Sequence, residues 1–140
     1  MDKVTLRVSG LPKGQPRPRA FARNGMVRMY DPGTAEGWKQ AVAVAARNAG
    51  VKTDAPVSVE MVFHMQRPTS HMGKGGIYVK PSAPVFHAQK PDVDNLAKAV
   101  LDALTTIGAW KDDAQVCRLL VSRQWNFGGI GECVILIEEL

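Results

Sequence analysis

The sequence predicts a single α/β domain, of the α+β kind, in which packed helices cover a mixed four-stranded sheet. Three segments place apolar residues at every second position, as half-buried strands do, and two segments space them three and four residues apart, as amphipathic helices do. A further short segment is apolar on both faces. The predicted order is β-α-β-α-β-β. A chain of 140 residues suffices for one buried core, so we expect one domain over residues 1–140.

The first predicted strand covers residues 3–9, where Val4, Leu6 and Val8 alternate with polar residues. Residues 10–30 are rich in proline, glycine and arginine. This composition predicts an irregular arm between the first strand and the first helix.

The first helix is expected to begin at Asp31–Pro32 or at Thr34. Asp and Thr side chains cap free N–H groups, and proline suits a first helical turn. Gly50 ends the helix. The apolar face is formed by Trp38, Val42, Ala45 and Ala49.

The second strand is predicted at Val57–Met65, in which every odd-numbered residue is apolar. Residues 66–91 follow with four prolines and three glycines, so we expect a long, mobile loop. Loops of this length inside a compact domain are usually functional or disordered.

The second helix is predicted from about Asp94 to Gly108. Residues 115–126 are predicted as the third strand, and Cys133–Ile137, apolar on both faces, as a central fourth strand after a tight turn at Gly128–Gly129. Hairpin pairing of these two strands would set Cys133 opposite about Gln124. We therefore expect no disulfide with Cys117 and interpret both cysteines as buried free thiols.

Charged residues are unevenly distributed along the chain, whose net charge is +5. Residues 3–30 hold seven basic residues and no acid, and residues 61–91 hold four more, all three histidines and no acid. Five of the thirteen acidic residues then gather at Asp92, Asp94, Asp102, Asp112 and Asp113. Carboxylates between basic segments are typical of a metal-using phosphodiesterase, because basic side chains hold phosphates and carboxylates hold a cation.

Eight basic residues are predicted to contact DNA: Lys13, Arg17, Arg19, Arg23, Arg67, Lys74, Lys80 and Lys90. Tyr78 and Phe86, in the same basic loop, are placed to stack on an unpaired base. The histidines are a poor metal set: His64 falls on a polar strand face, and His71 and His87 are interpreted as solvated loop residues. The tryptophans Trp38, Trp110 and Trp125 are expected in the core or in an interface.

The carboxylate spacing predicts a site around the second helix. Asp94, Lys98 and Asp102 occur at four-residue intervals and so share one helix face. Asp92 lies just before the helix, and Asp112–Asp113 follow it in a turn. Magnesium prefers oxygen ligands and keeps several waters, so two or three of these carboxylates suffice. Lys98 could offset carboxylate repulsion, position an attacking water or stabilise charge on a phosphate.

Simpler interpretations stay open for each residue. Asp94 fits a helix cap, and Asp112–Asp113 fits a turn. Lys98 with Asp94 and Asp102 fits a surface ion-pair ladder, worth about 0.5 kcal/mol per pair. The sequence excludes an EF-hand, because Leu96 takes the fifth loop position and no glycine follows. Taken together beside the basic segments, the acids favour a divalent-metal site.

The segment Lys-Pro-Asp-Val-Asp-Asn-Leu-x-Lys-x-x-x-Asp-Ala-Leu at 90–104, followed by Asp-Asp-x-Gln-Val at 112–116, resembles the RusA-type Holliday-junction resolvases (crossover junction endodeoxyribonucleases) of bacteria and prophages. Residues 10–19 are similar to the opening segment of that family. The resemblance implies a homodimer that uses Mg²⁺ or Mn²⁺ to nick opposed strands of a four-way DNA junction symmetrically. It also implies site roles by position: metal-binding for Asp92, Asp94 and Asp113, catalytic for Lys98, and a less critical one for Asp112.

The expected function is therefore resolution of Holliday junctions through attack of a metal-activated water on the phosphodiester, with two sites related by a two-fold axis. Rival functions are a non-catalytic, basic nucleic-acid-binding module, a nuclease for flaps, single strands or other branched DNA, and a phage assembly protein. Clustered acids around a lysine disfavour the last. No apolar run approaches the ~20 residues of a membrane span, and no signal-peptide core is present, so we expect a cytoplasmic protein without membrane contact.

Overall fold

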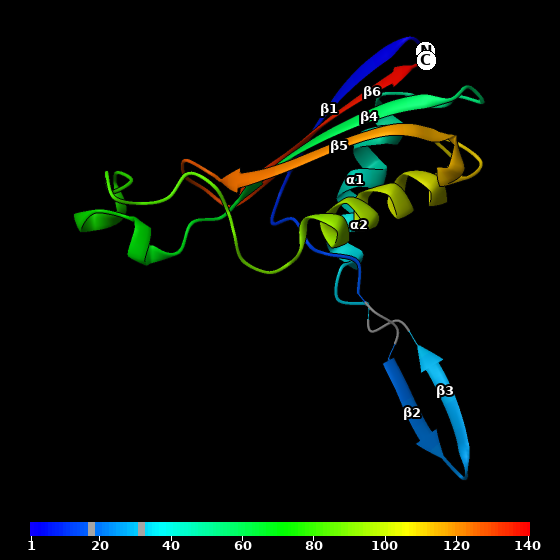
Figure 1. Cartoon of the computed structure of the whole chain (residues 1–140), viewed down its shortest axis with the longest axis horizontal. Helices are drawn as coiled ribbons and strands as arrows, with labels where there is room; N and C mark the ends of the chain where they lie inside the picture. Colours follow the sequence, from blue (N-terminus) through cyan, green and yellow to red (C-terminus); the bar gives the residue numbers. More distant parts are fainter. Residues whose placement is uncertain (17–18, 31–32) are drawn as a thin grey trace.

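A mixed sheet with two helices on one face forms the body of the protein in the computed structural model, which describes residues 1–16, 19–30 and 33–140 (Figure 1). The sheet contains β1 (Lys3–Ser9), β4 (Val57–Met65), β5 (Val116–Trp125) and β6 (Gly131–Glu139). Its strand order is β1-β6-β4-β5, with β4 and β5 parallel and the other neighbours antiparallel. The predicted α+β class is confirmed.

The core lies between the sheet and the helices. Burial alternates along β4, whose odd-numbered residues are all buried, as the period-two pattern predicted. The central position predicted for the fourth strand is confirmed, because β6 pairs with β1 on one side and with β4 on the other. A strand that is apolar on both faces gains most from two neighbours, whereas β5, with several exposed residues, forms the sheet edge.

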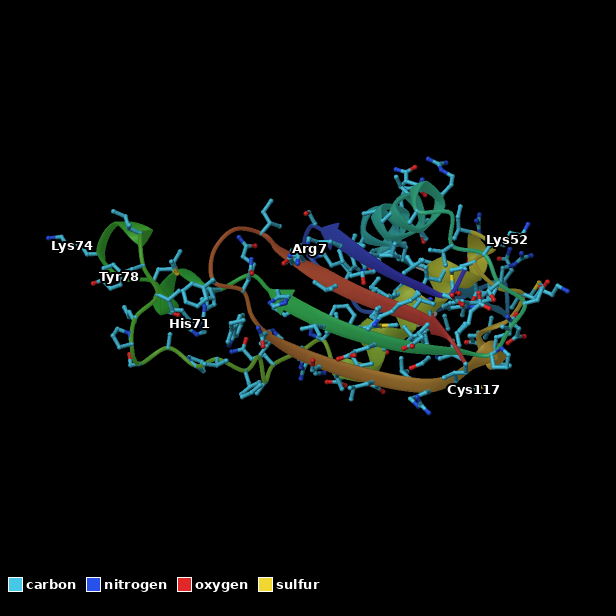
Figure 2. All side chains as sticks on the ribbon, turned by 90° about the horizontal axis from the view of Figure 1, so that it is seen from above. Arg7, Lys52, His71, Lys74, Tyr78 and Cys117 are labelled. Atoms are coloured by element: carbon cyan, nitrogen blue, oxygen red, sulfur yellow. The ribbon has the colours of Figure 1, made fainter. Side chains whose placement is uncertain are left out.

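The hairpin predicted between the last two strands is wrong. β4 lies between β5 and β6, so Cys133 pairs with Val8 and Phe63 instead of lying near Gln124. Cys133 is a buried free thiol as predicted, but Cys117 is exposed at the start of the edge strand. Figure 2 shows Cys117 at the end of the sheet opposite the long loop.

Helix α1 (Glu36–Asn48) buries Trp38, Val42 and Ala46. It begins two residues after Thr34, and the alternative start at Asp31–Pro32 lies outside the described residues. Gly50 follows the helix at φ +68°, a left-handed conformation that glycine adopts without strain, and its N–H bonds the carbonyl of Arg47. Helix α2 (Val93–Thr106) packs against α1 and buries six residues: Leu96, Ala97, Ala99, Val100, Ala103 and Leu104.

The arm expected to be irregular contains a hairpin, β2 (Arg19–Arg23) and β3 (Met26–Tyr30), so that expectation is corrected. Asn24 and Gly25 connect the strands at φ 52° and 72°, as a two-residue type I′ turn requires. The hairpin is a separate two-stranded sheet that projects from the body (Figure 1).

The 66–91 loop extends from the end of the sheet and carries internal hydrogen bonds. It holds two short 3₁₀ turns, η1 (Thr69–His71) and η2 (Lys74–Gly76), and an antiparallel bridge between Met72 and Val79. Figure 2 shows Lys74 and Tyr78 toward its tip. In the described part of the chain, no helix has the length and apolar character needed to cross a membrane.

Candidate functional site

Helix α2 presents two aspartates and a lysine to solvent at its amino-terminal half. Asp92 is the N-cap residue by backbone geometry (φ −67°, ψ 152°), yet its carboxylate caps no N–H group. Asp94 lies in the first turn, and Lys98 follows one turn later; all three are exposed. Among the described residues, none of the three side chains forms a hydrogen bond or an ion pair with another residue. The carboxylates and the ammonium group are therefore available to a ligand.

The surface ion-pair ladder considered for this helix face does not form. Asp102 pairs instead with Lys39 of α1, which ties the two helices together. Lys98 is left without that partner. This leaves a single exposed lysine between two groups of aspartates.

The second group of aspartates lies in the turn between α2 and β5. Asp112 caps the short turn η3 (Asp113–Gln115), accepting a 2.8 Å hydrogen bond from the N–H of Ala114. This bond, and then the neighbouring side chain of Asp113, hold the pKa of Asp112 below its ordinary value. The interpretation of Asp112 as a turn residue is thus correct as far as it goes. Its second oxygen is not used by the turn.

The turn is held in place from both ends. Trp110, which is buried, donates from Nε1 to Oγ1 of Thr105 at 2.9 Å. The Gln115 amide donates to the carbonyls of Thr53 and Ala55, both at 3.1 Å, and its Oε1 accepts from the N–H of Lys111 at 2.9 Å. Gln115 belongs to the motif at 112–116, but the sequence alone did not show that it anchors the acidic turn.

Lys98 and the two adjacent aspartates meet around one small hollow of about 170 Å³, which we call the acidic hollow. Its lining residues are Gln15, Lys98, Asp102, Thr105, Asp112 and Asp113. The folding of α2 back toward the turn brings together residues up to fifteen positions apart, Lys98 and Asp113. The ammonium group and the carboxylates are therefore neighbours in space.

Asp92 and Asp94 face other depressions. Asp94 borders an apolar groove of about 320 Å³ between α2 and β5, together with Lys98 and Leu119. Asp92 borders a depression of about 560 Å³ with Lys90, Pro91 and Asn95, which we call the Asp92 hollow. In the residues that the structure describes, no three acidic, histidine or cysteine side chains converge as a metal-binding group. The assignment of Asp92, Asp94 and Asp113 as joint metal ligands therefore stays a prediction.

The basic residues predicted to contact DNA are distributed over three segments. Lys13 and Lys90 border a large cavity at the end of the sheet. Lys74 and Lys80 are exposed in the long loop, and Arg23 is exposed at the hairpin turn. Arg17 and the side chain of Arg19 lie outside the described residues.

Arg67 has a structural task that the sequence did not reveal. Its guanidinium donates to the carbonyls of Asn126 at 2.7 Å and Pro84 at 2.8 Å, and it contacts Nδ1 of His71 at 3.3 Å. Most of its donors are thus used to hold the long loop. A direct phosphate contact by Arg67 has little support from this geometry.

His87 is not the solvated loop residue that was predicted. It is only 6% exposed and packs edge-on against Trp125, with ring centroids 4.3 Å apart. The ring of Trp125 also packs edge-on against His71, with centroids 4.8 Å apart, and the backbone N–H of Trp125 donates to the carbonyl of Val85. The loop therefore folds back onto the last residue of β5. All three tryptophans are buried, as expected.

Exposed carboxylates and a lysine, flanked by basic segments, are typical of proteins that process nucleic acid. Residues 9–134 match the model of the endodeoxyribonuclease RusA family. The chain is also similar to the uncharacterized protein YqaN of Bacillus subtilis (strain 168), with 37% identity over 129 residues that cover 90% of each chain. The chain thus belongs to the RusA endodeoxyribonuclease family, which confirms the resemblance drawn from the sequence.

Proposed function

We propose that the protein is a divalent-metal-dependent endodeoxyribonuclease that resolves four-way DNA junctions by paired nicks. The observation that carries the proposal is the placement of Lys98 between Asp94 on one side and the Asp112–Asp113 pair on the other. Family membership supports an endonuclease, and the exposed, unpaired acids of α2 support a site that binds a cation and a phosphate.

The chemistry of the donor set fits a magnesium or manganese ion. Asp112 and Asp113 are consecutive and line the same hollow, and such adjacent carboxylates repel unless a cation or a proton lies between them. The hydrogen bond from the Ala114 N–H lowers the pKa of Asp112 and so favours the ionised carboxylate that a cation requires. A divalent ion, when bound, supplies polarisation of the phosphate and compensation of its developing charge.

Asp92 and Asp94 add the outer carboxylates of the proposed site. Both are at the amino-terminal end of α2, whose partial positive charge favours anions, including a phosphate oxygen beside the carboxylates. Neither carboxylate is used to cap the helix. Each therefore keeps both oxygens for a cation, for a water ligand or for orienting the attacking water.

Lys98 places a positive charge at the point where we propose that the DNA phosphate binds. It borders both the acidic hollow and the apolar groove, and it has no ion-pair partner among the described residues. An ammonium group in this position attracts the DNA phosphate and stabilises the negative charge that grows on it during hydrolysis. A positioned donor of this kind is typically worth a factor of about 10² or more in rate.

A homodimer supplies the second nick. Two symmetric cuts in a four-way junction need two sites related by a two-fold axis. The edge strand β5 exposes Leu119 and Leu120 at 45% and 60%, and an unpaired, apolar strand edge is a surface that a second copy can cover. Leu119 of this strand lines the apolar groove with Asp94 and Lys98, so we propose that the dimer sets the distance between the two cuts.

The proposal is tested with a labelled mobile four-way junction and a linear duplex, in Mg²⁺, in Mn²⁺ and in EDTA. We expect wild type to make paired symmetric nicks on the junction only and only with metal. Asp94→Asn and Asp113→Asn should bind the junction but not cut it. Glu36→Gln, which removes an exposed carboxylate from the first turn of α1, is the matched control and should cut normally.

Three results would contradict the proposal in different ways. Binding without cutting in either metal would leave a non-catalytic DNA-binding module. Cutting of flaps or single strands in preference to the junction would indicate a nuclease of another specificity. If Asp94→Asn and Asp113→Asn both cut like wild type, the catalytic site lies elsewhere on the protein.

A further inference from the structure

A large cavity lies where three strands end, and we call it the strand-end cavity. β1, β4 and β5 run in the same direction, so the segments that follow them emerge at one end of the sheet. Loops beyond the carboxyl ends of strands commonly form ligand sites in open α/β sheets. Here they enclose about 810 Å³, within the ~300–1,000 Å³ range of sites for small ligands.

Two buried polar atoms of this cavity have no hydrogen-bond partner in the described structure. One is Nδ1 of His87, in a side chain that is 94% buried, and the other is Oε1 of Gln15. Buried polar atoms are nearly always paired, because an unpaired one loses its interaction with water for nothing in return. Both residues line the strand-end cavity, so a ligand in it can supply both partners.

The imidazole of His87 is suited to a neutral ligand group. Burial, and then the nearby charge of Arg123, lower the pKa of His87 below its ordinary value, so the ring is neutral near pH 7. A neutral imidazole presents one N–H donor and one acceptor nitrogen. Gln15 Oε1, as an amide oxygen, needs a hydrogen-bond donor from the ligand. A matching ligand therefore carries N–H donors beside acceptor atoms, as the Watson–Crick edge of each nucleobase does.

The walls and the rim of the cavity suit the two parts of a nucleotide. Trp125 and His87 form an edge-to-face aromatic wall, and Met65 lies next to it. An aromatic side chain such as Trp125 can pack against the face of a base. Lys13 and Lys90 lie on the rim, where their charges can hold a phosphate.

The cavity is continuous with the proposed nuclease site. Gln15 lines both the strand-end cavity and the acidic hollow, and its N–H bonds the carbonyl of Asn95 on α2 at 3.0 Å. Lys90 and Asn95 also line the Asp92 hollow. The strand-end cavity therefore adjoins both hollows that hold the carboxylates.

We propose that the strand-end cavity binds one unpaired nucleobase of the DNA, next to the phosphate that is cut. Gln15 and His87 read the base edge, Trp125 packs against the base, and Lys13 and Lys90 hold the adjoining phosphate. This inference rests on the proposed function, since branched DNA supplies unstacked bases at the branch point. It makes the cavity a specificity-determining site, because bases present different donor and acceptor patterns to Gln15 and His87.

The experiment measures junction binding in EDTA, so that no cutting occurs. A series of junctions carries one abasic nucleotide, moved step by step through the positions on either side of the branch point. At one position the missing base should weaken wild-type binding about tenfold, in the range expected for the loss of one stacked base. Gln15→Leu and His87→Phe should bind the intact junction about tenfold more weakly and lose most of that sensitivity.

Two controls keep the result interpretable. Gln124→Leu changes a glutamine of β5 whose side chain contacts His64, outside the cavity lining, and it should behave like wild type. Thermal unfolding of each variant shows whether it folds. Phenylalanine is used at position 87 because it keeps the aromatic wall, whereas a smaller residue would destabilise the loop.

The inference is overturned if no abasic position weakens wild-type binding, or if Gln15→Leu and His87→Phe stay as sensitive as wild type. A parallel reaction in Mg²⁺ separates this failure from that of the proposed function. A wild-type protein that cuts the intact junction symmetrically, yet is indifferent to every abasic site, keeps the nuclease proposal and loses the base-binding cavity. A protein that neither prefers nor cuts the junction loses both.

Discussion

Replacement of Gln115 by leucine tests whether the acidic turn is positioned by a single side chain. The Gln115 amide makes three hydrogen bonds, to the carbonyls of Thr53 and Ala55 and from the N–H of Lys111. Leucine has a similar size and makes none of them. Each such bond contributes about 1 kcal/mol net, but the site is only half-buried and water can replace part of the loss. We therefore expect the free energy of unfolding to fall by about 2 kcal/mol.

The loss should appear both in stability and in catalysis. For a domain of this size about 2 kcal/mol corresponds to roughly 6 °C in Tm. Because Gln115 anchors the turn that carries Asp112 and Asp113, junction cleavage at saturating DNA should slow by about tenfold or more, as small displacements of catalytic groups cost large factors in rate. Junction binding in EDTA should change little, since Gln115 does not line the acidic hollow, the Asp92 hollow, the apolar groove or the strand-end cavity.

Unfolding is followed by circular dichroism, and cleavage by single-turnover kinetics on the labelled junction. Gln124→Leu is the matched control: it removes a glutamine of the adjoining strand β5 whose amide makes one 3.3 Å contact, with His64. The reasoning is refuted if Gln115→Leu keeps both the wild-type Tm and the wild-type cleavage rate. A lower Tm with unchanged cleavage would show that the turn is stable without this anchor.

Three further predictions concern charge and titration. Replacing Arg23 and Arg28 of the exposed hairpin by glutamine should flatten the plot of log binding constant against log salt concentration. The slope should change by about 2, since each phosphate contact contributes about 0.9. An unchanged slope would show that the hairpin does not contact DNA. Folding lowers the pKa of His87, so near the ordinary histidine pKa the unfolded chain binds more protons than the folded chain. The free energy of unfolding should therefore rise with pH through about 6 and fall on acidification. His87→Phe should reduce this pH dependence, and parallel curves of unfolding free energy against pH for wild type and variant would contradict it. Burial raises the pKa of Cys133 to about 12, whereas Cys117 is exposed. At pH 8 a thiol reagent should therefore modify only Cys117 in the folded chain and both cysteines after denaturation. Rapid labelling of both cysteines in the folded protein would be inconsistent with the burial of Cys133.

The β2–β3 hairpin could have been predicted from the residues of its turn. Asn24–Gly25 is among the strongest short-range hairpin signals, because both residues tolerate the positive φ of a type I′ turn. The proline and glycine content of residues 10–30 pointed instead to an irregular arm. The apolar residues of the hairpin strands are consecutive, as in Ala20-Phe21-Ala22 and Met26-Val27, so the period-two alternation that identified the other strands is weak there.

The pairing of the last two strands illustrates a different limit. A glycine-rich turn between two adjacent strands favours a hairpin, yet β4 lies between β5 and β6. The reason is the position of β6, which is paired along both of its edges there and fully buries Cys133, Ile135 and Ile137 in the core. Gly131 permits this insertion: a Cβ there would lie 2.5 Å from the carbonyl oxygen of His64, so a larger residue would displace β6 from β4.

The sequence by itself determined the class of fold, the two helices, the four sheet strands and the motif that shows the family, because periodicity and spacing are local properties of the chain. The tertiary structure alone decided that Lys98 lies beside Asp112 and Asp113 while Asp92 and Asp94 border separate depressions. It also decided that Arg67 supports the loop and that His87 is buried against Trp125. These outcomes depend on which strands become neighbours and on how the loops at their ends pack, and such long-range contacts are set by burial of the whole core rather than by any local pattern.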